Sequence, residues 1–168
     1  MQARIKNPAM MVPEAMQALQ ALGKSLHNHR VSSTLLELIF LRVSQINGCA
    51  VCLDMHTRAL KRAGQSDERL STVAAWRDAP FFSDAERAAL ALAEASTRLS
   101  DRADAVPDEI WDEAARHYDE PQMATLVLAI ATINVWNRLN VTTRQIAGEW
   151  IKSAEARKWV EQGEAVAR

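Results

Sequence analysis

Two cysteines, Cys49 and Cys52, are the residues of this sequence whose type and spacing point most directly to chemistry. They are the two cysteines of the chain, and they stand three positions apart. Successive residues on a helix turn by about 100°, so positions three and seven beyond Cys49 fall within roughly 60° of it. We therefore expect Cys49, Cys52 and His56 on one helical face, with His56 one turn after Cys52.

This arrangement predicts redox chemistry at sulfur. Cysteine attacks peroxides and disulfides as the thiolate, whereas an ordinary thiol has a pKa of about 8.5 and is mostly protonated near neutral pH. The amide-rich helix start near Cys49, the imidazole of His56 and a carboxylate that polarises the imidazole could each remove or share the proton. Glu37 is the candidate carboxylate, because it lies in the apolar stretch 35–41, where an unpaired buried glutamate would be costly.

The same residue types leave other interpretations open. Two thiolates, an imidazole and a carboxylate also form a plausible zinc set, although zinc sites normally draw on ligands spread further along the chain. Structural cysteines are a second alternative, and Glu37 could point outward. The remaining histidines, His27, His29 and His117, show no register with the cysteines, so we interpret them as surface residues.

The elements that must position these residues are helices. Helical periodicity dominates the chain and the β-branched alternation of strands is nearly absent, so the sequence predicts an all-α fold. Prolines, capping residues and apolar spacing predict helices over residues 13–27, 33–46, 49–63, 84–99, 107–118 and 119–140, with a further segment from residue 66. Asn47 and Gly48 interrupt the chain just before the cysteines. We expect residues 141–168 to form a polar helical tail.

Length and composition bound the remaining possibilities. The 168 residues, 48% hydrophobic and 24% charged, predict one domain over residues 1–168 with a core over about 13–140. A formal charge of −1 produces no positive electrostatic field that would attract nucleic acid or anionic lipid, so neither is an expected partner. The most apolar segment, residues 123–136, falls short of the roughly 20 residues that cross a bilayer. The first twelve residues lack a secretory pattern, which predicts a cytoplasmic protein.

With these residues in view, the sequence resembles the alkylhydroperoxidase D family within the carboxymuconolactone decarboxylase-like superfamily. That family has a glutamate twelve residues before a cysteine pair and a histidine four residues after it, as Glu37 and His56 stand around the pair in this sequence. The flanking SQINGCAVCLDMHTRALKRAG is typical of the family, and INVWNRLN at 133–140 resembles its asparagine-rich last core helix. The likeness covers roughly residues 35–140.

The resemblance implies a function and a set of partners. It implies a helical domain that forms homo-oligomers, commonly trimers or hexamers, and a peroxidase that needs no haem, metal or other cofactor. Cys52 would attack a hydroperoxide to become a sulfenic acid, and Cys49 would resolve it to a disulfide with loss of water. Glu37 and His56 would form the proton relay. A lipoyl protein or a peroxiredoxin would be the thiol reductant.

The sequence departs from the family pattern at one position, and this difference leaves other functions open. The best-studied family members have a second histidine immediately before the second cysteine, where this chain has Val51. The shorter relay leaves room for a general thiol-disulfide oxidoreductase or a redox sensor. A lactone decarboxylase is the remaining alternative, although such relatives generally lack the cysteine pair. The helix dipole favours Cys49 as the more acidic thiol, whereas the neighbouring histidine and the resemblance favour Cys52 as the attacking one, which is our prediction.

Overall fold

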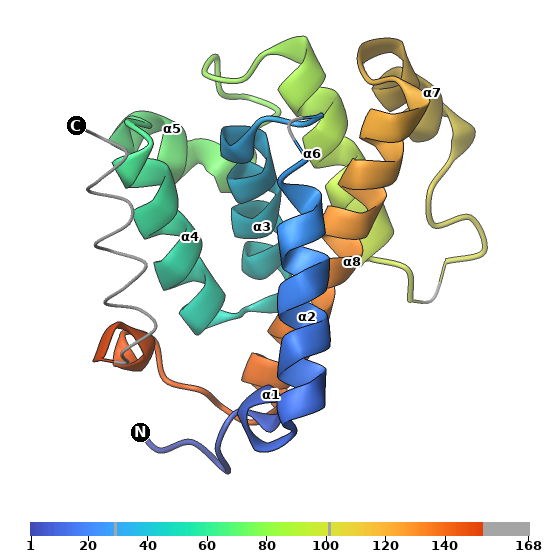
Figure 1. Cartoon of the computed structure of the whole chain (residues 1–168). Coiled ribbons are helices and arrows are strands. Elements are labelled where there is room, and N and C mark those ends of the chain that lie inside the picture. Colours follow the sequence, from blue (N-terminus) through green and yellow to red (C-terminus); the bar gives the residue numbers. More distant parts are fainter. Residues whose placement is uncertain (29, 101, 153–168) are drawn as a thin grey trace.

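The computed structural model describes residues 1–28, 30–100 and 102–152 (Figure 1). Its α-helices, in chain order, are α1 (Pro8–Met11), α2 (Pro13–Leu26), α3 (Ser33–Asn47), α4 (Ala50–Arg62), α5 (Asp67–Thr72), α6 (Asp84–Thr97), α7 (Asp108–His117) and α8 (Glu120–Thr142). Short 3₁₀ helices cover Val73–Ala75 and Glu149–Lys152. No strand occurs within the described ranges, and the predicted all-α class is confirmed.

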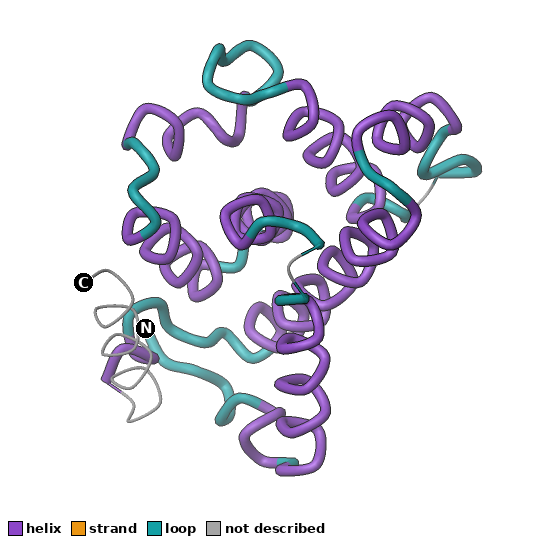
Figure 2. The backbone as a smooth tube through the Cα atoms, turned by 45° about the horizontal axis from the view of Figure 1, so that its top comes forward, coloured by secondary structure: helices purple, strands orange, loops and turns teal. Residues whose placement is uncertain are grey.

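Helix α3 is the centre of the fold. It packs against α4, α6 and α8, and in Figure 2 it is seen nearly end-on with the other helices around it. Its sequence is apolar on almost every side, which is the pattern of a helix buried all round. Leu36, Leu38 and Ile39 are accordingly inaccessible to solvent. A helix so placed can offer different side chains to different neighbours.

Capping residues begin several helices where the sequence predicts them. The side chain of Ser83 accepts a hydrogen bond from the Glu86 amide, and the Glu86 carboxylate accepts one from the Ser83 amide, which completes a capping box at α6. Asp119 and Gln122 form the same arrangement at α8. These local contacts satisfy amides that the first turn of a helix leaves unpaired, and they fix where both helices begin.

The junction between α3 and α4 positions the cysteines. Gly48 adopts a left-handed conformation with φ of 67°. Its amide donates to Gln45 O, and the Cys49 amide donates to Ser44 O at 3.0 Å, so α3 closes with a Schellman motif. Cys49 then becomes the N-cap residue of α4, with its Sγ accepting from the Cys52 amide. The sharp turn at Gly48 therefore places both cysteines in one helix start.

The predicted helical tail is wrong for residues 143–148. Helix α8 ends in a second Schellman motif, in which the amide of Arg144 donates to Val141 O and that of Gln145 to Asn140 O. Arg144 takes the left-handed conformation, φ 55°, that glycine usually supplies, so no glycine marks the end of the helix in the sequence. The part of the predicted tail beyond residue 152 lies outside the described residues. His29, predicted to be a surface residue, also lies outside them. Helix α1 was not predicted.

The surface position of two histidines is confirmed, since His27 and His117 are exposed. A membrane-spanning segment was not expected, and none of the helices in the described ranges combines the length and the apolar composition that crossing a bilayer requires.

Candidate functional site

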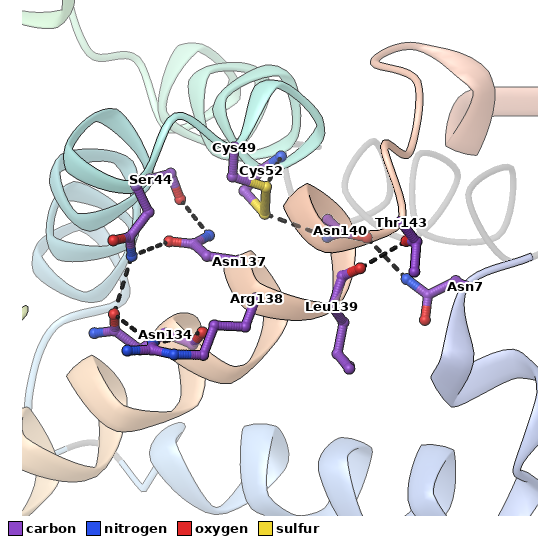
Figure 3. The surroundings of a disulfide bond; sticks show 11 residues. Asn7, Ser44, Cys49, Cys52, Asn134, Asn137, Arg138, Leu139, Asn140 and Thr143 are labelled. Carbon is purple, nitrogen blue, oxygen red and sulfur yellow. Dashed lines mark hydrogen bonds between the residues drawn. A yellow bond between two sulfur atoms is a disulfide. The ribbon is translucent and has the colours of Figure 1, made fainter. Parts of the chain in front are cut away.

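The two cysteines are joined. Cys49 and Cys52 form a disulfide with Cα atoms 5.4 Å apart, at the start of α4 (Figure 3). Both are buried. Because Cys49 Sγ is also the N-cap acceptor, at 3.4 Å from the Cys52 amide nitrogen, the helix start favours negative charge on that sulfur. The structure therefore brings the predicted dithiol pair together.

The predicted acid-base pair is also brought together. His56, one turn after Cys52 on α4, places Nδ1 at 2.8 Å from Glu37 Oε2 on α3. Phe40, one turn along α3, packs its ring against the imidazole with centroids 5.1 Å apart. Burial lowers the pKa of the nearby Arg62, and the charge of Glu37 opposes that shift. Glu37 therefore points toward His56 rather than outward, and its carboxylate pairs with the imidazole.

A cavity of about 820 Å³ is lined by one of the two cysteines. Cys52 and His56 belong to its lining, whereas Cys49 and Glu37 do not. The rest of the lining is mostly apolar and includes Phe40, Val51, Met55, Ile133, Trp136 and Trp150. A small molecule in this cavity would meet the sulfur of Cys52 beside an imidazole whose far nitrogen is held by a carboxylate.

Asparagines of α8 connect this site to the rest of the fold. Asn47, at the end of α3, donates from Nδ2 to Oδ1 of both Asn134 and Asn137, at 2.9 Å each. One turn further along α8, the Nδ2 of Asn140 lies 3.4 Å from Cys52 Sγ (Figure 3). Sequence reasoning associated the asparagine-rich segment with the family but assigned Asn140 no role. The signal was available, since asparagines recur at helical spacing within an otherwise apolar helix.

Within the described ranges, no group of three or more histidine, cysteine, aspartate or glutamate residues is arranged to hold a metal ion.

The sequence of this chain is similar to those of known proteins that share one family. Residues 13–95 match the carboxymuconolactone decarboxylase family. The chain is also 40% identical over 129 residues to the uncharacterized protein YdfG of Bacillus subtilis, a match that spans 77% of this chain and 86% of YdfG. The chain belongs to the carboxymuconolactone decarboxylase family. It is also 44% identical over 45 residues to the alkyl hydroperoxide reductase AhpD of Bradyrhizobium diazoefficiens, a match that covers 27% of this chain and 25% of that protein.

Solved structures agree with this assignment. A protein of unknown function from Agrobacterium tumefaciens, named as a candidate antioxidant defence protein AhpD, superposes with a TM-score of 0.81 at 32% identity over 87% of this chain and 98% of that one. The debrominase Bmp8 shares the fold, with a TM-score of 0.74 at 23% identity over 83% of this chain and 74% of its own. The AhpD-like fold and family that the sequence predicted are thus confirmed.

Proposed function

We propose that this protein is a thiol-dependent peroxidase that reduces hydroperoxides by cycling Cys49 and Cys52 between dithiol and disulfide. One observation carries the proposal: Cys52 faces the 820 Å³ cavity together with His56, and Glu37 holds the other side of that imidazole. The AhpD-like family membership supports it. Access also supports Cys52 as the attacking thiol, because Cys49 is absent from the cavity lining.

The first step breaks the peroxide bond. The Cys52 thiolate attacks the terminal oxygen of the hydroperoxide, the O–O bond breaks, and Cys52 becomes a sulfenic acid. The departing alkoxide takes a proton from His56 and leaves as an alcohol. Because Nδ1 of His56 faces Glu37, the proton is transferred through Nε2, and the carboxylate stabilises the imidazolium that supplies it.

The second step forms the disulfide. Cys49 loses its thiol proton and attacks the sulfenic sulfur of Cys52; the S–O bond breaks, and the sulfenic oxygen takes up that proton and leaves as water. In the disulfide the Cα atoms lie 5.4 Å apart, within the range that disulfides require, so the start of α4 can hold the product of this step. One hydroperoxide and two thiols thereby yield one alcohol, one water and one disulfide. A thiol reductant, a lipoyl protein or a peroxiredoxin by family resemblance, returns the pair to the dithiol, and a homo-oligomer is the proposed assembly.

The test counts thiols. Reduced protein treated with one equivalent of an organic hydroperoxide, in the absence of added metal, should lose both of its reactive thiols. Cys52→Ser should abolish peroxide consumption and keep Cys49 as a thiol. Cys49→Ser is the matched control, because it should still consume one equivalent and trap a sulfenic acid that dimedone labels. A fully active Cys52→Ser variant would refute the proposal.

A general thiol-disulfide oxidoreductase is the second candidate, and Val51 favours it. This residue lines the cavity next to Cys52 with an aliphatic side chain, so it offers no second proton donor for a departing alkoxide. A protein of this second kind would be oxidised readily by a small disulfide and slowly by a hydroperoxide. The ratio of these two oxidation rates in the reduced protein separates the two functions.

A further inference from the structure

Asn140 and Asn7 form a chain of side-chain amides that ends on the sulfur of Cys52. Asn7 Nδ2 donates to Asn140 Oδ1 at 2.8 Å, and Asn140 Nδ2 donates to Cys52 Sγ at 3.4 Å (Figure 3). We propose that Asn140 is the hydrogen-bond donor that stabilises the Cys52 thiolate, and that Asn7 is the positioning residue that fixes the orientation of the Asn140 amide. This inference rests on the proposed function only in naming Cys52 as the attacking thiol.

A single backbone amide determines the orientation of both side chains. Asn7 is the N-cap residue of α1, and its Oδ1 accepts from the Ala9 amide at 3.0 Å. A backbone N–H can only donate, so the Asn7 oxygen must face Ala9 and its Nδ2 must face Asn140. Asn140 therefore has to present its oxygen to Asn7 and its NH₂ group to the sulfur. Without Asn7, the amide of Asn140 could turn and offer its oxygen to Cys52.

The segment before α1 is held against the end of α8, which keeps Asn7 in place. The Arg4 amide donates to Thr143 O at 2.9 Å, and its guanidinium donates to Thr142 O at the same distance. Gln145 Nε2 donates to Ile5 O at 2.9 Å. These contacts join residues more than 130 positions apart in sequence. Asn7 and Asn140 are thus positioned by one local packing arrangement between the two ends of the described chain.

Asn140 differs from the other polar groups around Cys52 because its side chain is not ionisable. Cys49, the N-cap of α4, and His56 on α4 lie on either side of Cys52 in sequence, and Glu37 of α3 contacts the imidazole. Across the cavity the ionisable side chains are Lys6, His27 and Glu149, from the N-terminal segment, the end of α2 and the second 3₁₀ helix. Asn140 is neutral at every pH, and a hydrogen bond to a charged acceptor is stronger than one to a neutral acceptor. It therefore stabilises the thiolate in preference to the thiol.

The experiment measures the pH midpoint of alkylation at one sulfur. In a Cys49→Ser background, where serine keeps the N-cap and Cys52 is the remaining cysteine, the rate of reaction with iodoacetamide is followed across pH by mass spectrometry. Asn140→Asp keeps the acceptor for Asn7 but places a carboxylate against the sulfur. It should move the midpoint upward and slow alkylation at pH 6 by at least about tenfold, as expected when a hydrogen bond to a charged group is lost.

Asn7→Ser isolates the positioning role. Serine also caps a helix but is too short to reach Asn140, so the midpoint should rise and the rate at pH 6 should fall by about three-fold. Asn28→Ser is the matched control, because Asn28 likewise accepts from an amide two residues on, that of Arg30, and donates to a side chain of α8, Thr125. It lies away from the cysteines, and its alkylation profile should equal that of the parent.

The alkylation profiles test the donor role of Asn140 and the positioning role of Asn7 separately. An unchanged midpoint in Asn140→Asp would refute the donor, and equal profiles for Asn7→Ser and Asn28→Ser would refute the positioning role. Thermal unfolding checks that each variant is folded. If Asn140→Asp does not fold, the comparison of Asn7→Ser with Asn28→Ser still tests whether the Asn140 amide acts on the sulfur. No peroxide is used, so a parent protein that consumes no peroxide would refute the peroxidase while leaving these shifts intact.

Discussion

Helix α3 contributes to two carboxylate clusters on different faces, one partly buried and one buried, and they contrast in the kind of partner that each carboxylate has. Glu37 lies on this helix and contacts His56 of α4, whereas Arg42 lies on it and contacts Glu94 of α6. Five positions separate Glu37 from Arg42, which places their side chains about 140° apart around the axis. One helix thereby supplies a member to each cluster.

Glu94 is surrounded by donors that never lose their charge or proton. Its carboxylate accepts from Arg42 Nε at 2.6 Å, Arg77 at 2.8 Å, Trp76 Nε1 at 2.9 Å and Arg98 at 3.2 Å. Burial by itself raises the pKa of Glu94, but the hydrogen bonds from Arg77, Trp76 and Arg42 outweigh it and hold the pKa at about 2. Such a carboxylate stays ionised and has no proton to exchange.

Glu37 differs because the side chain that it contacts at 2.8 Å can change protonation. It contacts the imidazole of His56, and its side chain is 22% exposed, against 6% for Glu94. A histidine can accept and release a proton near neutral pH, whereas an arginine cannot. The comparison teaches that a buried carboxylate with permanent cations stabilises the fold, while one with an imidazole beside a cavity is suited to proton transfer.

The largest expected effect is on stability, at Glu94. Glu94→Gln leaves Arg42, whose side chain is 10% exposed, without a charged partner, so the free energy of unfolding at pH 7 should fall by about 3–5 kcal/mol. Glu37→Gln, the same substitution in the other cluster, should cost less than about 1 kcal/mol. Denaturant titration of both variants measures the difference. Equal losses of unfolding free energy would contradict the view that the Glu94 cluster stabilises the fold and the Glu37 pair does not.

The pH dependence of stability tests the same cluster in the unmodified protein. The pKa of Glu94 is lower in the folded state, about 2, than its ordinary 4.5, so folding favours the ionised form. The resulting stabilisation of about 3 kcal/mol is fully present above pH 4.5 and is lost as the pH falls toward 2. The stability difference between the native chain and Glu94→Gln, measured by denaturant unfolding at each pH, should shrink over that window. A constant difference would contradict the assignment.

Short-range features of fold and site could be predicted from sequence. The capping box of Ser83 and Glu86 and the interruption at Gly48 depend on contacts within a few residues, so their patterns identify helix boundaries directly. The shared face of the cysteine pair and His56 follows from helical geometry in the same way. Glu37 was inferred from the cost of burying it and from the family spacing. Its contact with His56 then required α3 and α4 to pack together.

Long-range contacts could not be predicted. Arg42 and Glu94 are 52 positions apart, and Asn7 and Asn140 are 133 apart. No local periodicity relates such residues, because their pairing depends on how the helices pack. The end of α8 was missed for a different reason, since Arg144 adopts a left-handed conformation without the glycine that usually marks it.

The next effect is on catalysis, at His56. His56→Gln removes the proton donor while keeping an amide that can reach Glu37, so peroxide consumption should fall by about 100-fold, the range of general acid-base catalysis. His117→Gln is the matched control, because His117 also contacts a glutamate, Glu113 at 3.3 Å, but far from the cysteines. Its peroxide consumption should be unchanged. If the two variants are equally active, the Glu37 and His56 pair has no role in proton transfer.

The smallest expected effect separates the partners of Glu94 from one another. Arg77 donates to Glu94 at 2.8 Å and stacks on the ring of Trp76, but its side chain is 57% exposed. Solvent screens an exposed ion pair and can replace its hydrogen bond, so Arg77→Ala should lower the free energy of unfolding by no more than about 1 kcal/mol. Arg42→Ala should cost several times more, because it removes the buried cation. Denaturant titrations of the two variants measure the difference. If Arg77→Ala were as destabilising as Arg42→Ala, the burial of an arginine would not determine how much it stabilises the fold through Glu94.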